Sequence, residues 1–323
     1  MSLGEFMENG SMVSPNGRRK KGKPELNIKP PAYKKIPFGC KPIDELFLGG
    51  VKVTKPLMIF GRSGIGKTWL CTQLACNFTR IDKKRKVLYI NTEADFDDEN
   101  VEIILGYFQK RWRDIDVSRI EFKDIRTLFD LGRFFGMQFE IEIKEKSVTA
   151  IVKYPKTSRP VKTSVKDEAW FTASPFYKLM STGEYGLVII DSLSAIVKPE
   201  IPRGTQYLPA RATLQTPLLS AWLTSSGIFY APVVFTVHGS VNPQGQALDS
   251  PFGGEDLKFY IKHILGILPP TKDIVPERYK QLWRRFRRVW RYRYGFLDQE
   301  MRTVVLAKDY GYTDLSYLAG GVA

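Results

Sequence analysis

The sequence is poor in cysteine, and its few cysteines lack the spacing typical of disulfide frameworks or zinc sites. Its 323 residues include three, Cys40, Cys71 and Cys76, an odd number with no Cys-x-x-Cys pair. This usage argues against a disulfide framework and against a zinc site, and it is typical of a reducing compartment. We therefore expect a cytoplasmic protein that folds around an apolar core, for which hydrophobic residues at 43% are sufficient.

Long apolar runs are also missing. The longest lies at about 228–237, in the middle of the chain, and is too short to span a bilayer. The first residues lack the charged start and apolar run of a signal peptide. No amphipathic basic helix is evident, so binding to a membrane surface has little support. The sequence predicts no membrane partner.

Acidic residues are outnumbered: 34 Asp and Glu face 49 Lys and Arg, giving a net charge of +15. This balance favours polyanions such as nucleic acid, or else is only the basic surface of a soluble protein. Residues 1–33 are rich in Gly, Pro, Ser, Lys and Arg and poor in apolar residues. We expect a disordered basic tail there, and one folded domain over 34–323.

Short apolar runs alternate with helical patterns through most of the domain. The sequence predicts helices over 68–79 and 98–113, and strands over 56–60, 86–90, 187–190 and 233–237. Strands that alternate with helices form a mostly parallel sheet covered on both faces. The predicted fold class is therefore α/β.

Two segments depart from this alternation. Residues 139–143 and 148–154 predict a β-hairpin, which a basic stretch at 156–166 follows, so that 138–166 resembles an insertion. Residues 278–293 hold eight Lys or Arg and five aromatic residues. Alternation over 289–294 favours a strand with one packed face, whose arginines then serve a neighbouring subunit's ATP or line a DNA channel.

The most specific signal is a complete GxxxxGK[ST] motif, with an apolar strand before it and a helix after it. Its glycines let backbone N–H groups approach phosphates, and the helix points its positive end at them. The lysine is expected to reach the β- and γ-phosphates of ATP, and the threonine hydroxyl to bind Mg²⁺. The motif consists of Gly61, Arg62, Ser63, Gly64, Ile65, Gly66, Lys67 and Thr68.

Two acidic residues follow predicted strands and are expected at the same edge of the sheet as this loop. Asp191 ends the apolar run 187–190, which suits a residue that holds the water shell of Mg²⁺. Glu93 follows the strand at 86–90 and is the candidate for orienting the attacking water. For each carboxylate the alternative is an ordinary surface or helix-capping acid.

With these motifs the sequence resembles the RecA superfamily, and most closely the archaeal RadA group. Residues 36–46, 92–96 and 187–196 are similar to family segments around the ATP site, and the likeness extends over about 34–315. It implies a DNA-stimulated ATPase that assembles into filaments or rings on DNA, above all on single-stranded DNA. The DNA contacts it implies are Arg203, Tyr207 and Arg211 in a first loop, and Asn242 and Gln244 in a second.

The chain also departs from the family's pattern. Where these recombinases carry an Asn-Gln pair that senses the γ-phosphate, this sequence has Val237 and His238. His238 can donate a hydrogen bond or carry a proton near neutral pH, and so replace the sensor, or it can be structural. No clear Phe-x-x-Ala polymerisation motif is visible. These differences suggest a RadA paralogue or a divergent viral relative.

Three functions remain open on the sequence. The first is a DNA-dependent ATPase of recombination or repair. The second is a recombination mediator with weak ATPase activity that loads another recombinase. The third is an ATPase like KaiC or the hexameric helicases, which share the same core. An ATP turnover assay distinguishes the DNA-dependent ATPase from the mediator, and an assay of duplex unwinding identifies a helicase-like ATPase.

Overall fold

The computed structural model describes residues 28–93, 98–144, 147–154, 169–201, 205–240, 250–251, 254–307 and 309–319. The expected tail extends to residue 33, but two of its last residues belong to the fold. Ile28 packs against the apolar core, and the Tyr33 hydroxyl donates to Asp82 Oδ2 at 2.7 Å. The earlier residues of the tail, and the basic stretch 156–166, lie outside the described residues.

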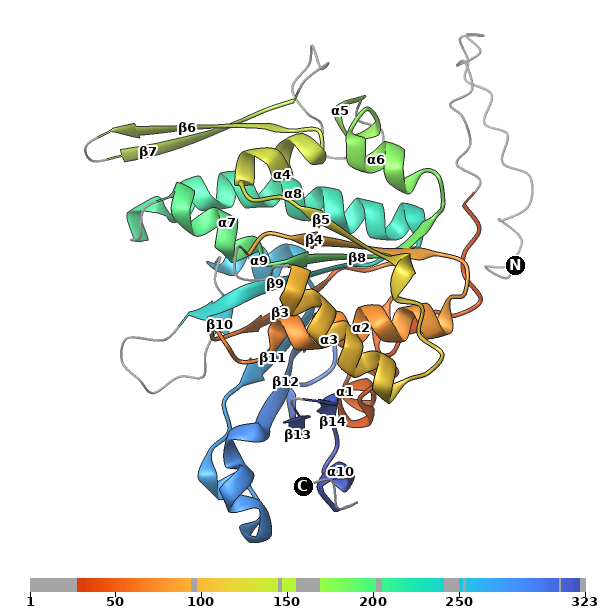
Figure 1. The fold of residues 1–323 in the computed structure, drawn as a ribbon. Helices are drawn as coiled ribbons and strands as arrows, with labels where there is room; N and C mark the ends of the chain where they lie inside the picture. The colour runs from red at the N-terminus through yellow and green to blue at the C-terminus, as the bar shows by residue number, and fades with distance from the viewer. Residues whose placement is uncertain are drawn as a thin grey trace, which may run out of the picture.

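A ten-stranded sheet forms the centre of the molecule (Figure 1). Its strands run in the order β14-β13-β12-β11-β3-β9-β8-β4-β5, and β10 pairs with β9. Strands from β11 to β5 are parallel to their neighbours, whereas β11 to β14 form an antiparallel extension. Their bounds are β3 Leu57–Gly61, β4 Lys86–Asn91, β5 Ile120–Asp124, β8 Tyr185–Asp191, β9 Val233–Ser240, β10 Ser250–Pro251, β11 His263–Leu268, β12 Phe286–Tyr294, β13 Glu300–Ala307 and β14 Gly311–Thr313.

Helices cover both faces of this sheet, as Figure 1 shows, which confirms the predicted α/β fold. On one face lie α1 Lys41–Leu46, α2 Lys67–Ile81 and α3 Asp98–Arg111; on the other lie α4 Leu128–Phe134, α6 Pro175–Met180, α7 Leu193–Glu200, α8 Leu208–Phe229 and α9 Gly254–Tyr260. Short elements complete the described chain: β1 Lys35–Ile36, β2 Val51–Lys52, α5 Ala169–Thr172, α10 Ser316–Ala319, and the 3-10 helices η1 Val117–Arg119, η3 Thr205–Tyr207, η4 Lys272–Ile274 and η5 Glu277–Arg285. Among the described residues, no helix combines the length and the apolar character that crossing a bilayer requires.

Alternation along the central strands divides the core into two layers. On β3, Met58 and Phe60 face the layer beneath α4, α7 and α8, whereas Leu57 and Ile59 face the layer beneath α1 and α2. Both layers are fully buried, which explains why these strands read as continuous apolar runs in the sequence. The three cysteines are all buried and unpaired within the second layer.

The predicted hairpin is present as β6 Gln138–Lys144 and β7 Ser147–Lys153, paired antiparallel. Its inner face, which includes Phe139 and Val152, packs on the same core layer as α8. Polar and charged residues predominate on the outer face, where Lys153 pairs with Glu140 at 2.5 Å. Ile143 near the tip is 65% exposed, so the hairpin extends beyond the helices it covers (Figure 1).

Strand β12 is present as predicted, but the expectation of one packed face is wrong. Trp290 packs in one core layer, while Val289 and Tyr294 pack in the other. A register shift opposite Ile264 and Leu265 changes the alternation, so that Tyr294 lies on the face of Val289 rather than with Trp290. Side chains of β12 are therefore buried in both core layers.

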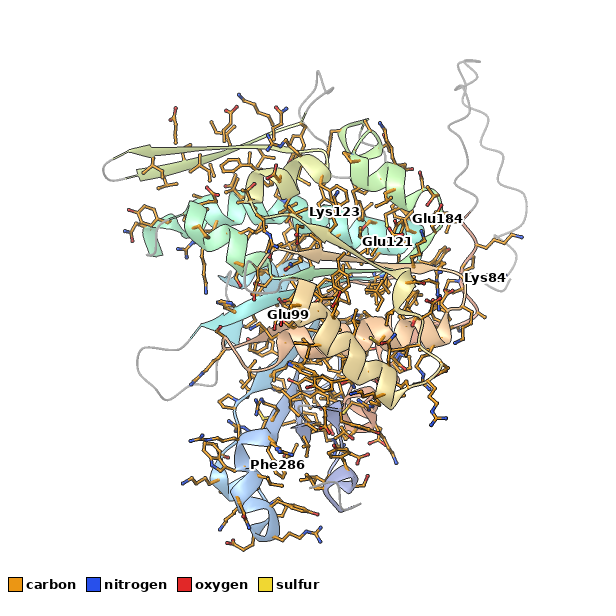
Figure 2. All side chains as sticks on the ribbon, viewed as in Figure 1. Lys84, Glu99, Glu121, Lys123, Glu184 and Phe286 are labelled. Carbon is orange, nitrogen blue, oxygen red and sulfur yellow. The ribbon has the colours of Figure 1, made fainter. Side chains whose placement is uncertain are left out.

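Charged side chains protect β5, the edge strand of the main sheet. Figure 2 shows Glu121, Lys123 and Glu184 gathered at this edge. Glu121 pairs with Lys86 Nζ at 2.6 Å and accepts from the Tyr185 hydroxyl. Charges along an edge strand oppose unwanted pairing with another sheet.

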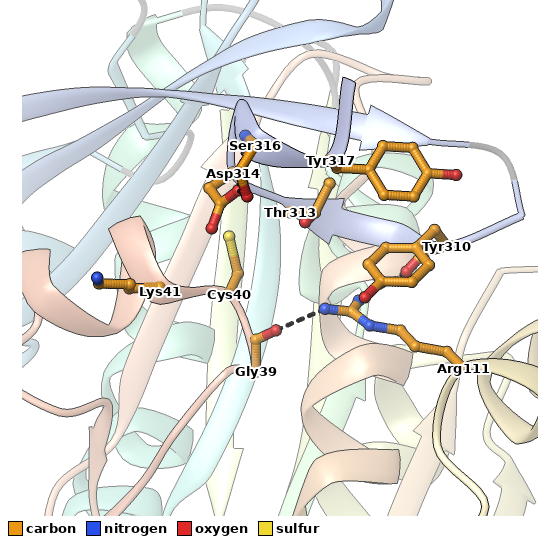
Figure 3. Close-up of a pocket in the computed structure, with 9 residues that line it drawn as sticks. All are labelled: Gly39, Cys40, Lys41, Arg111, Tyr310, Thr313, Asp314, Ser316 and Tyr317. Atoms are coloured by element: carbon orange, nitrogen blue, oxygen red, sulfur yellow. Dashed lines mark hydrogen bonds between the residues drawn. The ribbon is translucent and has the colours of Figure 1, made fainter. Parts of the chain in front are cut away.

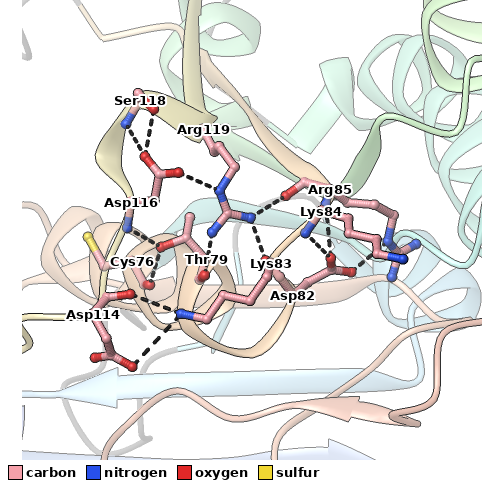
Figure 4. A network of polar contacts seen from close by, with 10 residues as sticks. All are labelled: Cys76, Thr79, Asp82, Lys83, Lys84, Arg85, Asp114, Asp116, Ser118 and Arg119. Carbon is pink, nitrogen blue, oxygen red and sulfur yellow. Dashed lines mark hydrogen bonds and ion pairs between the residues drawn. The ribbon is translucent and has the colours of Figure 1, made fainter.

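A polar network closes the C-terminal end of α2, as Figure 4 shows. The Arg119 guanidinium donates to three backbone carbonyls, those of Thr79 at 2.5 Å, Asp82 at 2.5 Å and Arg85 at 3.1 Å. Its Nε also pairs with Asp116 Oδ2 at 2.8 Å. One side chain thereby satisfies carbonyl groups that the end of a helix leaves without intrahelical partners.

We expect Arg119→Met to lower the free energy of unfolding by about 2–3 kcal/mol, because it leaves part-buried carbonyls without donors. Nucleotide affinity should stay unchanged, since the network lies at the opposite end of α2 from the phosphate loop. Urea unfolding of the variant checks the first expectation. Arg113→Met removes an exposed arginine nearby and serves as the control. Equal stability of the two variants would contradict the capping role.

Candidate functional site

The glycine-rich loop connects β3 to α2 at the carboxyl edge of the parallel sheet. Gly66 is the N-cap of α2 with φ 111°, and Gly64 has φ 70°, a region that side chains with a Cβ rarely adopt. A Cβ on Gly61 would lie 2.5 Å from Ile267 O, so glycine is also required for close packing there. The loop therefore has the backbone geometry that cradles phosphate at a helix N-terminus.

Lys67 lies inside this loop. Its Nζ donates to Gly61 O at 3.2 Å and to Arg62 O at 3.0 Å, and its side chain is buried. Burial lowers the pKa of the ammonium group, while Asp191 and Glu93 act in the opposite direction. A buried cation held by neutral carbonyls is well suited to bind an anion that enters the loop.

Asp191 stands at the end of β8, two strands away from β3, and is buried. Tyr89 on β4 donates to its Oδ2 at 3.0 Å, and Thr236 on β9 donates to its Oδ1 at 2.5 Å. These two donors fix the orientation of the carboxylate. Neither donor can be predicted from the sequence, because each belongs to a strand other than β8.

Glu93 follows β4, and His238 lies near the end of β9, opposite Gly61 of the loop. The distance from His238 Nε2 to Glu93 Oε1 is 3.9 Å. Four side chains meet at this edge. Asp191 ends β8, Glu93 follows β4 and His238 lies on β9, while Lys67 begins α2 after the loop that follows β3. The expected grouping of the two acids with the loop is therefore seen in the structure.

Lys198 on α7 determines which nitrogen of His238 carries the proton. Its Nζ lies 2.6 Å from His238 Nδ1, and an ammonium group can only donate, so Nδ1 accepts and Nε2 holds the hydrogen. Desolvation, then Lys198 and Lys67, lowers the pKa of His238 to about 4. Of the two roles that the sequence leaves open for His238, hydrogen-bond donation and carrying a proton near neutral pH, this environment favours the neutral donor, whose Nε2 faces Glu93.

The donor set fits Mg²⁺ bound together with phosphate rather than a metal held by protein alone. In the described part of the chain, no group of three or more His, Cys, Asp or Glu side chains is arranged to bind a metal. The Thr68 hydroxyl and the Asp191 carboxylate could supply hard oxygen ligands, and Mg²⁺ usually completes its shell with water and substrate phosphates. Thr68 lies in the first turn of α2, directly after Lys67.

Comparison with known proteins agrees with this geometry. A family model described as the bacterial DnaA ATPase domain matches residues 50–133. The DNA repair and recombination protein RadA of Aeropyrum pernix is 25% identical over 252 residues, which cover 77% of this chain and 65% of that protein. The DNA repair and recombination protein RadB of Archaeoglobus fulgidus is 24% identical over 235 residues, 72% of this chain and 82% of the relative. These matches agree with the resemblance to the RecA/RadA-like superfamily.

A solved structure of a RadB recombinase superimposes on this RecA/RadA-like chain with a TM-score of 0.56. It is 18% identical in sequence, and the superposition covers 87% of this chain and 99% of that one. At this level of identity the likeness concerns the fold alone. The RadA match spans slightly less than two thirds of the Aeropyrum protein, at 65%.

The residues expected to contact DNA are divided between described and undescribed parts of this RecA/RadA-like chain. Arg203, Asn242 and Gln244 lie outside the described residues. Tyr207 ends η3 and packs partly against the core. Arg211 lies on α8 rather than in a loop and is 8% exposed, because the helix begins earlier than its Gly- and Pro-containing flank suggests.

The second expected loop starts and ends in a short antiparallel pair of strands. Gly239 and Ser240 of β9 pair antiparallel with Pro251 and Ser250 of β10. His238 immediately precedes this ladder, and Lys198 lies near the end of α7, just before the first expected loop. The hydrogen bond between Lys198 and His238 therefore joins the starting points of both loops.

The C-terminal strands brace the region behind the phosphate loop. The Arg111 guanidinium donates to Gly39 O at 2.8 Å and to Tyr312 O at 3.2 Å, and it also donates to Tyr310 O at 2.6 Å. Figure 3 shows this arginine beside Tyr310 in a cavity of about 510 Å³. From α2, Gln73 bonds to both the backbone N and the backbone O of Tyr312. Strand β14 is thus fixed against α2.

Proposed function

We propose that this protein binds and hydrolyses ATP in a DNA-dependent manner and acts in homologous recombination or DNA repair. The observation that carries the proposal is the meeting of Lys67, Asp191, Glu93 and His238 at one edge of the sheet, beside a complete phosphate loop. This set contains a phosphate-binding cation, a metal-binding carboxylate, a carboxylate for water and a neutral hydrogen-bond donor.

Each side chain has a distinct task in the proposed reaction. Lys67 and the loop amides bind the phosphates, while Thr68 and Asp191 would hold Mg²⁺, whose charge would neutralise the charge that develops on the phosphates. Glu93 orients the attacking water and accepts its proton. The Nε2–H of His238 donates to the γ-phosphate, and the hydrogen bond from Lys198 to Nδ1 keeps it in the donating tautomer.

Contact with DNA is proposed through the two loops and the basic surface. The net charge of +15 favours polyanion binding, and phosphate neutralisation supplies most of such affinity. The Lys198–His238 hydrogen bond joins the points where the two loops begin. A loop that becomes ordered on DNA would therefore hold the His238 Nε2–H in position to donate to the γ-phosphate. This link offers a physical route by which DNA raises the rate of hydrolysis.

Binding to single-stranded DNA is expected to weaken steeply with salt, because each neutralised phosphate releases counterions. Arg203→Ala should lower the affinity and the DNA-stimulated ATPase rate, yet leave ATP affinity unchanged. Arg113→Ala, an exposed arginine at the far end of α2, is the control. Fluorescence-anisotropy titrations at several salt concentrations, paired with ATPase assays on the same DNA, make the measurement.

The outcomes of that experiment separate the competing functions. ATP turnover with little stimulation by DNA would favour a recombination mediator, and duplex unwinding would favour a helicase-like or KaiC-like ATPase. Electron microscopy with DNA and ATP tests for the filament or ring of copies that we propose. Absence of DNA affinity even at low salt would overturn the recombination role.

A further inference from the structure

One carbonyl of the phosphate loop receives two hydrogen bonds from the C-terminal strands. Ile65 O accepts from Arg287 Nε on β12 at 2.8 Å and from the Tyr312 hydroxyl on β14 at 3.3 Å. These donors lie 222 and 247 residues away along the chain. The contact is close, since a Cβ on Gly66 would lie 2.6 Å from the Tyr312 hydroxyl oxygen and 2.7 Å from Leu306 Cδ2.

Holding this carbonyl also fixes an amide of the loop. The peptide group is planar and trans, so its C=O and N–H point in opposite directions. The N–H in the same peptide as Ile65 O belongs to Gly66, the N-cap of α2. With the oxygen held toward β12 and β14, that N–H is turned to the other side of the loop, where phosphate binds at the helix N-terminus.

The arginine is itself held in place. Its NH1 donates to Arg284 O at 2.6 Å and to Phe286 O at 2.7 Å, where η5 joins β12. The planar guanidinium can reach the phosphate loop and the end of η5 at the same time because its donors form a rigid fork. Tyr312 is fixed on its other side by Gln73 and Arg111.

We propose that Arg287 and Tyr312 are positioning residues that hold the phosphate loop in its phosphate-binding conformation before nucleotide arrives. The inference rests on the proposed function, since it concerns the same nucleotide site. The loop amides contact phosphate in the ground state and in the transition state alike. Loss of their preorganisation therefore weakens binding and raises KM, with little change in kcat.

The test compares Arg287→Gln with Arg288→Gln. Arg288 is the next residue on β12 and donates its Nε to Pro269 O at 3.1 Å, away from the loop, so it controls for loss of an arginine-to-backbone bond. We expect Arg287→Gln to weaken the binding of fluorescent ATP and ADP analogues about tenfold, and to raise KM to the same extent with kcat within about twofold. Tyr312→Phe should act in the same direction but less, and Arg288→Gln should change neither quantity.

Hydrogen–deuterium exchange of the nucleotide-free protein gives a readout that does not depend on ATP. Amides of residues 61–67 should exchange faster in Arg287→Gln than in Arg288→Gln. Equal exchange and equal affinity in the two variants would overturn the inference. If the parent protein binds neither ATP nor ADP, the proposed function itself fails, and the exchange data still decide whether Arg287 orders the loop.

Discussion

Replacing Lys67 with alanine is expected to reduce ATP turnover by at least about a hundredfold, with the fold intact. The side chain is buried, and its ammonium group donates to two carbonyls of the glycine-rich loop. Without it, charge on the β- and γ-phosphates loses its nearest compensating cation. Steady-state assays of phosphate release measure the effect, with thermal unfolding as a check on folding.

Lys84→Ala is the matched control for this experiment. Lys84 is an exposed lysine in the turn after α2, as Figure 2 shows, and it lies far from the phosphate loop. Its replacement should leave turnover unchanged. Full activity in a folded Lys67→Ala protein would show that the loop is not the site of hydrolysis.

Replacing Glu93 with glutamine should lower turnover on the order of a hundredfold or more, while ATP still binds. Glutamine keeps the size of the side chain and can still form hydrogen bonds, but it cannot take a proton from water. A binding titration and a turnover assay on the same preparation separate these two effects. The expected pattern is a fall in kcat with the dissociation constant for ATP nearly unchanged.

Glu99→Gln provides the control, because Glu99 is an exposed acid on α3 that undergoes the same chemical change. It should behave as the parent protein does. Equal turnover in Glu93→Gln and Glu99→Gln would mean that another residue orients the water. Because His238 Nε2 lies 3.9 Å from Glu93, His238→Ala would then be the next variant to measure.

The parts of the fold that could be predicted from sequence are those with local patterns. Strand β3, helix α2 and strands β4, β8 and β9 were each signalled by an apolar run or by the glycine motif, and their ends agree within a few residues. The acids Glu93 and Asp191 could be placed at the rim because parallel strands bring their carboxyl ends together. Such inferences need only the strand and the residue that follows it.

The residues that could not be predicted act across long sequence separations. Thr236 bonds to Asp191 from another strand, and Lys198 bonds to His238 across the gap between α7 and β9. Arg287 belongs to the basic run 278–293, and nothing in that run predicts its hydrogen bond to the phosphate loop. The change of face along β12 arises from a register shift against β11, which alternation within one strand does not reveal.

Because the three cysteines are buried, the rate at which each is alkylated reports how often the structure around it opens. Burial raises the pKa of Cys40 to about 12 and raises the pKa of Cys71 and Cys76 as well, and only the thiolate reacts readily. Alkylation in the native state must therefore wait for exposure of each thiol. Cys71 lies near the phosphate-loop end of α2, and Cys76 lies closer to its far end. The alkylation rates of Cys71 and Cys76 therefore distinguish fraying of α2 beside the phosphate loop from opening of the whole helix, without any engineered probe.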